Sequence, residues 1–276
     1  MGKSITDSKG SFTLHNGVKM PYLGLGVFKC ERVTNSVLWA LDSGYRHIDT
    51  AAIYDNEKEV GTAIKQSDVD RDKIFLVSKV WNTDQGFQNT IKAYDESLKK
   101  LKVDYLDLYL IHWPVKNKFV ETWKALEYLY EQGRVKSIGV SNFLKHHLEE
   151  LLPESTIIPM VNQMEFHPNL VQQELVDFCN LKGIQYEAWS PLMRGKIFEI
   201  ELLKNLSVKY QKTIAQIVLR WDLQKGIVTI PKSSNEKRIR SNTDLFDFEL
   251  SQEDVDAIDL LDRNLRIGPD PNNFSF

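Results

Sequence analysis

Four polar side chains have the types that proton transfer needs: Asp49, Lys79 and His112, which end short apolar runs, and Tyr54, five residues after Asp49. A tyrosine hydroxyl titrates near about 10, and a lysine ammonium beside it lowers that pKa by stabilising the phenolate. An aspartate keeps the lysine charged and in place, while a histidine can hydrogen-bond the oxygen that the tyrosine protonates. The group suits protonation of an oxygen that acquires negative charge, and it contains no obvious nucleophile.

Each of these residues also has an ordinary structural explanation. Asp49 could cap a helix, Tyr54 could lie on a surface loop, Lys79 could be a solvated charge and His112 a satisfied core histidine. Because three of them end successive strand-like runs, their convergence in one active site is the better interpretation.

The elements that would position them alternate along the chain. Strand-like runs cover residues 22–27, 46–49, 74–80, 105–112, 136–140, 160–166, 185–190 and 226–231. Helical spacing of apolar residues predicts helices over 33–42, 88–101, 119–130 and 213–224, and from Ser251 onward. Eight strands with helical connections predict an α/β fold, a single (β/α)8 TIM barrel domain over residues 1–276.

Two local features refine this prediction. Residues 11–20 alternate as a β-hairpin with a two-residue turn at Asn16-Gly17, and the hairpin is expected to cap the bottom of the barrel. The rival fold is a doubly wound open sheet, which normally carries G-x-G-x-x-G after its first strand. Here Gly24 and Gly26 are present but the third glycine is missing.

A second cluster, Lys232, Ser233, Arg238 and Asn242, follows the eighth predicted strand. Barrels often bind phosphate there, and these side chains can hold a phosphate dianion by charge and hydrogen bonds. The alternative is a solvated basic helix face. Aromatic residues near strand ends could line an apolar pocket, although core packing is the usual fate of such rings: Phe28, Trp81, Trp113 and Trp189.

Composition limits the possible partners. The net charge is −3 and no basic run appears, which argues against nucleic acid. Cys30 and Cys179 lack metal-ligand spacing and fit a reducing compartment. Apolar runs are too short to span a bilayer and no signal core is apparent, so a cytoplasmic protein is expected. The Met1-Gly2 start matches a loose lipidation pattern, for which chance is the simpler explanation.

The chain resembles the aldo-keto reductases, especially the microbial branch with 2,5-diketogluconate reductases and protist prostaglandin F synthases. Residues 44–51 with Tyr54, residues 160–168, and residues 230–233 with Arg238 and Asn242 are similar to three signatures of that family, and residues 139–143 fit as well.

The resemblance implies NADPH as the cofactor and reduction of aldehydes and ketones. Tyr54 would be the general acid, Lys79 and Asp49 its tuning pair, and His112 the orienting group. Further residues would bind the cofactor: Ser141, Asn142 and Gln163 at the carboxamide, Trp189 on the ring, Ser190 and Leu192 along the pyrophosphate, Lys232, Ser233 and Arg238 at the 2′-phosphate, and Asn242 at the adenine. Phe28, Trp81 and Trp113 would form the wall of the substrate pocket.

Three positions depart from the family's pattern. Ser241 stands where many members have glutamate, Met193 where glycine is common, and Val27 where threonine or methionine is common. A small-molecule carbonyl substrate, no membrane or metal, and a monomer are expected. The alternative function is a regulatory subunit that binds NADPH without rapid turnover, and a barrel hydrolase or isomerase is a third possibility.

Overall fold

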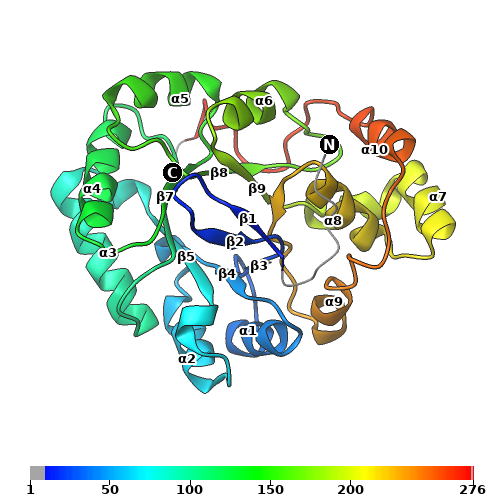
Figure 1. Cartoon of the computed structure of the whole chain (residues 1–276), viewed down its shortest axis with the longest axis horizontal. Coiled ribbons are helices and arrows are strands. Elements are labelled where there is room, and N and C mark those ends of the chain that lie inside the picture. The colour runs from blue at the N-terminus through cyan, green and yellow to red at the C-terminus, as the bar shows by residue number, and fades with distance from the viewer. Residues whose placement is uncertain (1–9, 275) are drawn as a thin grey trace.

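The computed structural model describes residues 10–274 and 276, and it contains eight parallel strands curled into a barrel (Figure 1). Each strand pairs with the next in sequence: β3 (Leu25–Gly26), β4 (His47–Asp49), β5 (Phe75–Val80), β6 (Leu108–Ile111), β7 (Ile138–Ser141), β8 (Val161–Glu165), β9 (Gln185–Trp189) and β10 (Val228–Thr229). Backbone bonds from Gly24 N to Thr229 O at 2.9 Å and from Gly26 N to Pro231 O at 3.3 Å close the ring. The predicted TIM barrel is therefore confirmed, and all eight predicted strands are present.

The N-terminal hairpin is confirmed, but its predicted two-residue turn is wrong. Strands β1 (Ser11–Thr13) and β2 (Lys19–Pro21) are antiparallel, and Leu14 N donates to Val18 O at 2.9 Å. The loop between that pair has three residues and ends at Gly17, whose φ is +88°. A glycine in the left-handed region is the usual end of such a three-residue loop.

Helices cover the outside of the barrel: α1 (Val33–Asp42), α2 (Glu57–Gln66), α3 (Phe87–Leu101), α4 (Phe119–Glu131), α5 (Lys145–Leu151), α6 (Gln173–Leu181), α7 (Glu201–Tyr210), α8 (Ile214–Gln224), α9 (Glu236–Ser241) and α10 (Gln252–Asp259). The predicted helices correspond to α1, α3, α4, α8 and α10. Thr213 caps α8 by accepting from Gln216 N at 3.2 Å, and Ser251 caps α10 by accepting from Asp254 N at 3.2 Å.

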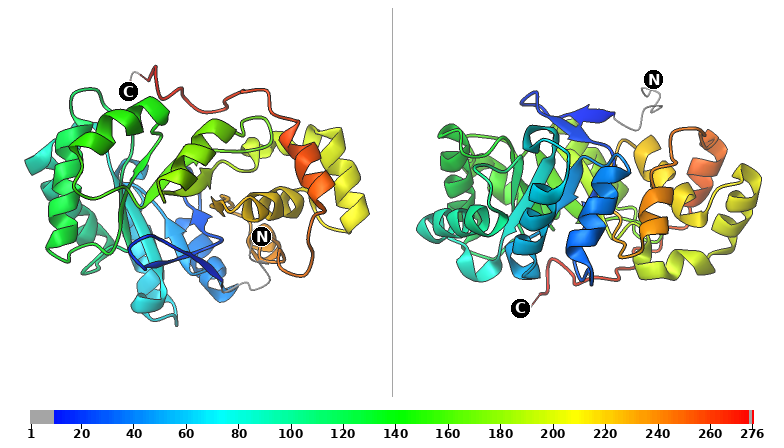
Figure 2. Two further views of the ribbon diagram at one scale, coloured as in Figure 1. Left: turned by 45° about the horizontal axis from the view of Figure 1, so that its top comes forward. Right: turned by 90° about the horizontal axis from the view of Figure 1, so that it is seen from below.

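The two ends of the barrel are covered differently. Figure 2 shows the β1–β2 hairpin on one side and the last residues of the chain crossing the other. The predicted polar N-terminus over residues 1–10 lies almost wholly outside the described residues, as does the Met1-Gly2 start. No helix in the described part of the chain has the length and apolar character that a membrane crossing requires.

Candidate active site

The four predicted catalytic residues lie at the carboxyl ends of three neighbouring strands. Asp49 is the last residue of β4, Lys79 precedes the last residue of β5, and His112 directly follows β6. Tyr54 ends the short 3-10 helix η1 (Ala52–Tyr54) that follows β4. Because these strands pair in sequence order, the structure brings all four side chains together.

The Lys79 ammonium is completely buried, and each of its three hydrogens has an acceptor. Nζ donates to Asp49 Oδ1 at 2.7 Å, to Asp49 Oδ2 at 2.8 Å and to the Thr50 carbonyl at 2.8 Å. Burial is the largest single influence and lowers the pKa of Lys79, but the charge and hydrogen bonds of Asp49, together with Tyr54 and Glu187, outweigh it, and the pKa is raised. Lys79 therefore carries a fixed positive charge.

The Tyr54 ring is close to both Lys79 and His112. Lys79 Nζ lies 5.1 Å from the ring centroid, and the His112 imidazole approaches edge-on with the centroids 5.6 Å apart. Burial, the largest influence, and the charges of Asp49 and Glu187 raise the pKa of Tyr54 by more than Lys79 lowers it. The net direction is thus opposite to the one expected from the lysine alone, and the hydroxyl keeps its proton at neutral pH.

His112 is held as a neutral imidazole. Burial first, and then the charge of Lys79, place the pKa of His112 well below its usual value. Asn142 Nδ2 donates to the His112 carbonyl at 2.9 Å, which fixes the backbone that carries the ring. A neutral imidazole can orient an oxygen by a hydrogen bond.

A second buried layer lies under these four residues. Gln163 Nε2 donates to Asp49 Oδ2 at 2.9 Å and to Glu187 Oε2 at 2.8 Å. Glu187 Oε1 in turn lies 3.3 Å from Nε2 of His47. Both N–H groups of the Gln163 amide are therefore used by carboxylates, and only its oxygen remains for a ligand.

The residues expected around a nicotinamide lie at the ends of β7, β8 and β9. Ser141 Oγ donates to the Gln163 carbonyl at 3.0 Å, and Asn142 Nδ2 lies 3.1 Å from Ser141 Oγ. The Trp189 indole N–H donates to Asn142 Oδ1 at 2.9 Å. A tyrosine, which is more frequent at this position in the family, has no ring N–H and could not form this bond. Gly268 is packed so closely on Trp189 that a Cβ there would lie 2.3 Å from the indole.

Three predicted pocket aromatics surround the Tyr54 end of the barrel. Phe28 lies 4.8 Å from the Tyr54 ring and is 46% exposed, and Trp81 lies 5.2 Å from the His112 ring. Trp113 is buried and contacts aromatic residues near the end of the chain, one of which also stacks on Trp81.

Two of those residues, Phe274 and Phe276, were not predicted for the site. Their ring centroids are 5.0 and 5.3 Å from Trp113, and Phe276 stacks on Trp81 at 5.6 Å. The Phe-x-Phe spacing is visible in the sequence, but nothing local indicates that it returns to the strand ends.

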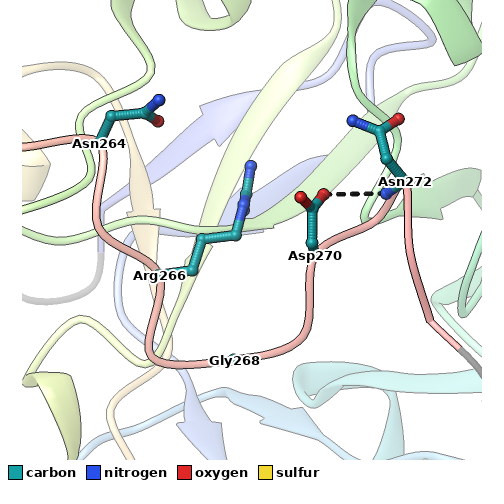
Figure 3. Close-up of a pocket in the computed structure, with 5 residues that line it drawn as sticks. All are labelled: Asn264, Arg266, Gly268, Asp270 and Asn272. Atoms are coloured by element: carbon teal, nitrogen blue, oxygen red, sulfur yellow. Dashed lines mark hydrogen bonds between the residues drawn. The ribbon is translucent and has the colours of Figure 1, made fainter.

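The segment that carries these rings also borders an open cavity of about 410 Å³ (Figure 3). Glu165 ties the segment down by accepting from Ile267 N at 2.6 Å and Gly268 N at 3.1 Å. Asp270 accepts from Asn272 N at 2.9 Å and stabilises the following turn.

The loop after β9 carries Ser190 and Leu192, both partly exposed. Ser190 has a φ of +53° and Met193 a φ of +50°. The left-handed conformation explains why glycine suits position 193, and burial of the Met193 side chain offsets the strain here.

The predicted phosphate cluster extends from the loop after β10, which carries Lys232 and Ser233, to Arg238 on α9 and Asn242 at its end. Lys232 and Arg238 are exposed, whereas Ser233 and Asn242 are buried. Among the described residues, neither cation forms an ion pair, although Arg240 on the same helix binds Glu236 at 2.8 Å. The pair of unsatisfied cations beside a serine fits an anionic group. Two further positions, Ser241 and Val27, also depart from the family's pattern. Ser241 Oγ donates to the Arg238 carbonyl at 3.2 Å, and Val27 is buried.

The chain belongs to the Aldo/keto reductase family, whose profile matches residues 23–263. It is 57% identical to the glyoxal reductase of Bacillus subtilis, across 98% of this chain and 99% of that protein. It is 51% identical to the 9,11-endoperoxide prostaglandin H2 reductase of Trypanosoma cruzi, across 95% of each. A crystal structure of a Gox0644 mutant in complex with NADPH superposes with a TM-score of 0.93 at 42% identity, covering 98% of this chain and 100% of that one. The predicted family resemblance is confirmed.

Proposed function

We propose that this protein reduces small aldehydes and ketones to alcohols with NADPH, with Tyr54 as the general acid. The observation that carries the proposal is the buried Lys79, which is bound to Asp49 and to the Thr50 carbonyl directly beside the Tyr54 ring. A charge fixed there stabilises the negative charge that Tyr54 acquires when it gives up its proton.

The residues present fit the cofactor. The free oxygen of Gln163 can accept from a carboxamide, and the Trp189 ring is held by Asn142 and Gly268 in a position where a flat ring can stack. Lys232 and Arg238 offer charges without a carboxylate partner among the described residues, which favours the 2′-phosphate of NADPH over NADH. Bound in this way, NADPH supplies hydride to the substrate carbon. Ser190, Leu192 and Asn242 keep their expected roles at the pyrophosphate and adenine.

Residues of the protein orient and protonate the carbonyl oxygen of the substrate. The neutral His112 orients the carbonyl oxygen, and Tyr54 transfers its hydroxyl proton to it as negative charge develops. Lys79 stays protonated throughout, because Asp49 remains beside it. Phe28, Trp81 and Trp113, with Phe274 and Phe276, limit the space for the rest of the substrate.

The similarity to a glyoxal reductase makes small dicarbonyl aldehydes the first substrates to test. We expect loss of NADPH absorbance with glyoxal or methylglyoxal, and slower turnover with NADH. A ketose and a prostaglandin endoperoxide complete the panel. Tight NADPH binding without turnover of any member would favour the regulatory subunit instead. Gel filtration tests the expected monomer.

A further inference from the structure

Glu187 and His47 are a buried titratable pair that the proposed chemistry does not use. Both are completely buried, and Glu187 Oε1 lies 3.3 Å from His47 Nε2. The imidazole is tightly enclosed: a Cβ on Gly24 would lie 2.7 Å from His47 Cγ, and the Phe75 ring approaches edge-on at 5.1 Å. Gly24 thus makes room for this ring.

The charges around Glu187 determine whether its carboxyl group is ionised or protonated. Asp49 and Glu187 both accept from the Gln163 amide, but Lys79, the cation that this cluster contains, is already bound to Asp49. An ionised Glu187 would be an uncompensated buried charge, which is strongly unfavourable.

Two arrangements remove that charge. A proton on His47 would create a second buried ion pair, whereas a proton on Glu187 Oε1, donated to His47 Nε2, leaves both side chains neutral. Burial favours the neutral arrangement. The pKa values agree, since burial and then the Asp49 charge raise the pKa of Glu187 to about 8, while burial lowers the pKa of His47 to about 3.

Glu187 Oε1 and His47 Nε2 face each other at 3.3 Å, and neither atom has a hydrogen-bond partner among the described residues. We propose that Glu187 is a positioning residue: protonated on Oε1 and turned toward His47, it stays neutral and holds the Gln163 amide with its oxygen toward the nicotinamide. The identity of that ligand rests on the proposed function. Asp49 alone accepts from one N–H and leaves the amide free to rotate. The second acceptor, Glu187 Oε2, uses the other N–H and fixes the orientation.

The test compares three variants for NADPH binding, followed by quenching of tryptophan fluorescence. Glu187→Gln keeps an acceptor for Gln163 and a donor for His47, so it should bind NADPH within about twofold of wild type. Glu187→Leu removes both and should weaken NADPH binding about tenfold. Asp222→Leu is the matched control, because Asp222 is also fully buried but lies on the outer helix α8, where it accepts a hydrogen bond from Thr229 of β10. It should unfold more easily without changing the NADPH affinity of the folded protein.

Two results would overturn the proposal. One is unchanged NADPH binding in Glu187→Leu, and the other is a loss in Glu187→Gln as large as that in Glu187→Leu. If the leucine variant does not fold, infrared spectroscopy decides: the wild-type minus Glu187→Gln difference spectrum should show the C=O stretch of a protonated carboxyl. Its absence would mean that Glu187 is ionised.

Failure of the proposed function would look different. A wild-type protein that binds NADPH but reduces no carbonyl contradicts the reductase, and the binding and infrared results still test Glu187.

Discussion

Lys79 and Lys232 are the same residue type in two contrasting regions of the site. Lys79, at the end of β5, is completely buried and gives all three hydrogens to acceptors of the chain. Lys232, after β10, is exposed and forms no ion pair with the described residues. A buried cation must be neutralised by the fold itself, whereas an exposed cation can remain hydrated until an anion binds.

The difference separates two tasks. The buried region is organised before any ligand arrives, which suits stabilisation of charge that appears during a reaction. The exposed region provides charge for recognition, which is sensitive to salt. Substitutions of Tyr54 and Lys79 should therefore affect mainly catalysis and folding, whereas substitutions of the exposed cations should affect mainly cofactor affinity.

The largest expected effect is that of Tyr54→Phe. Loss of the hydroxyl should lower kcat by about 10²–10⁴-fold, because the general acid is removed while the ring contacts with His112 and Phe28 remain. NADPH binding should be retained. Steady-state kinetics check this, with Tyr128→Phe on the exposed face of α4 as the control. Near-normal kcat would contradict Tyr54 as the acid.

Lys79→Met tests the folding part of the buried region. It leaves the Asp49 carboxylate buried without its cation, which should cost about 3–5 kcal/mol of unfolding free energy, measured with urea. The double variant with Asp49→Leu should recover most of that stability but no activity. Failure to recover would show that the pair is not the source of the loss. Lys232→Met should leave stability almost unchanged.

The buried region should also give stability a pH dependence. The pKa of Glu187 is raised from 4.5 to about 8, so the unfolded state loses this proton at a lower pH than the folded state. The contribution is complete below pH 4.5 and is lost as pH rises toward 8, with a slope of at most about 1.4 kcal/mol per pH unit. Urea unfolding between these limits should show this component in wild type and not in Glu187→Gln. Identical pH profiles would contradict a raised pKa.

The smallest effect is expected in the exposed region. Arg238→Ala should weaken NADPH binding about tenfold at low salt, less at high salt, and leave NADH binding unchanged. Lys237→Ala, one residue away and also exposed, is the matched control and should have little effect. Equal losses for NADPH and NADH would contradict the 2′-phosphate assignment.

Helix prediction succeeded where local signals were complete and failed where packing decided. Thr213 and Ser251 predict the starts of α8 and α10, because their side chains cap the first turn of each helix. The helix α2 was not predicted, and it contains Gly61, a poor helix former. A Cβ there would lie 2.1 Å from the Leu101 carbonyl, so glycine is required by the packing of α2 against the end of α3.

The amino-acid sequence by itself determined the barrel, the family and the four candidate catalytic residues, Asp49, Tyr54, Lys79 and His112. The spacing of apolar residues, the ends of the strands and the family signatures are all properties of the order of residues. The tertiary structure decided the direction of the Tyr54 pKa, the return of Phe274 and Phe276 to Trp113, and the contact of Glu187 with His47. These depend on burial and on distances between residues far apart in sequence, which the order of residues does not contain.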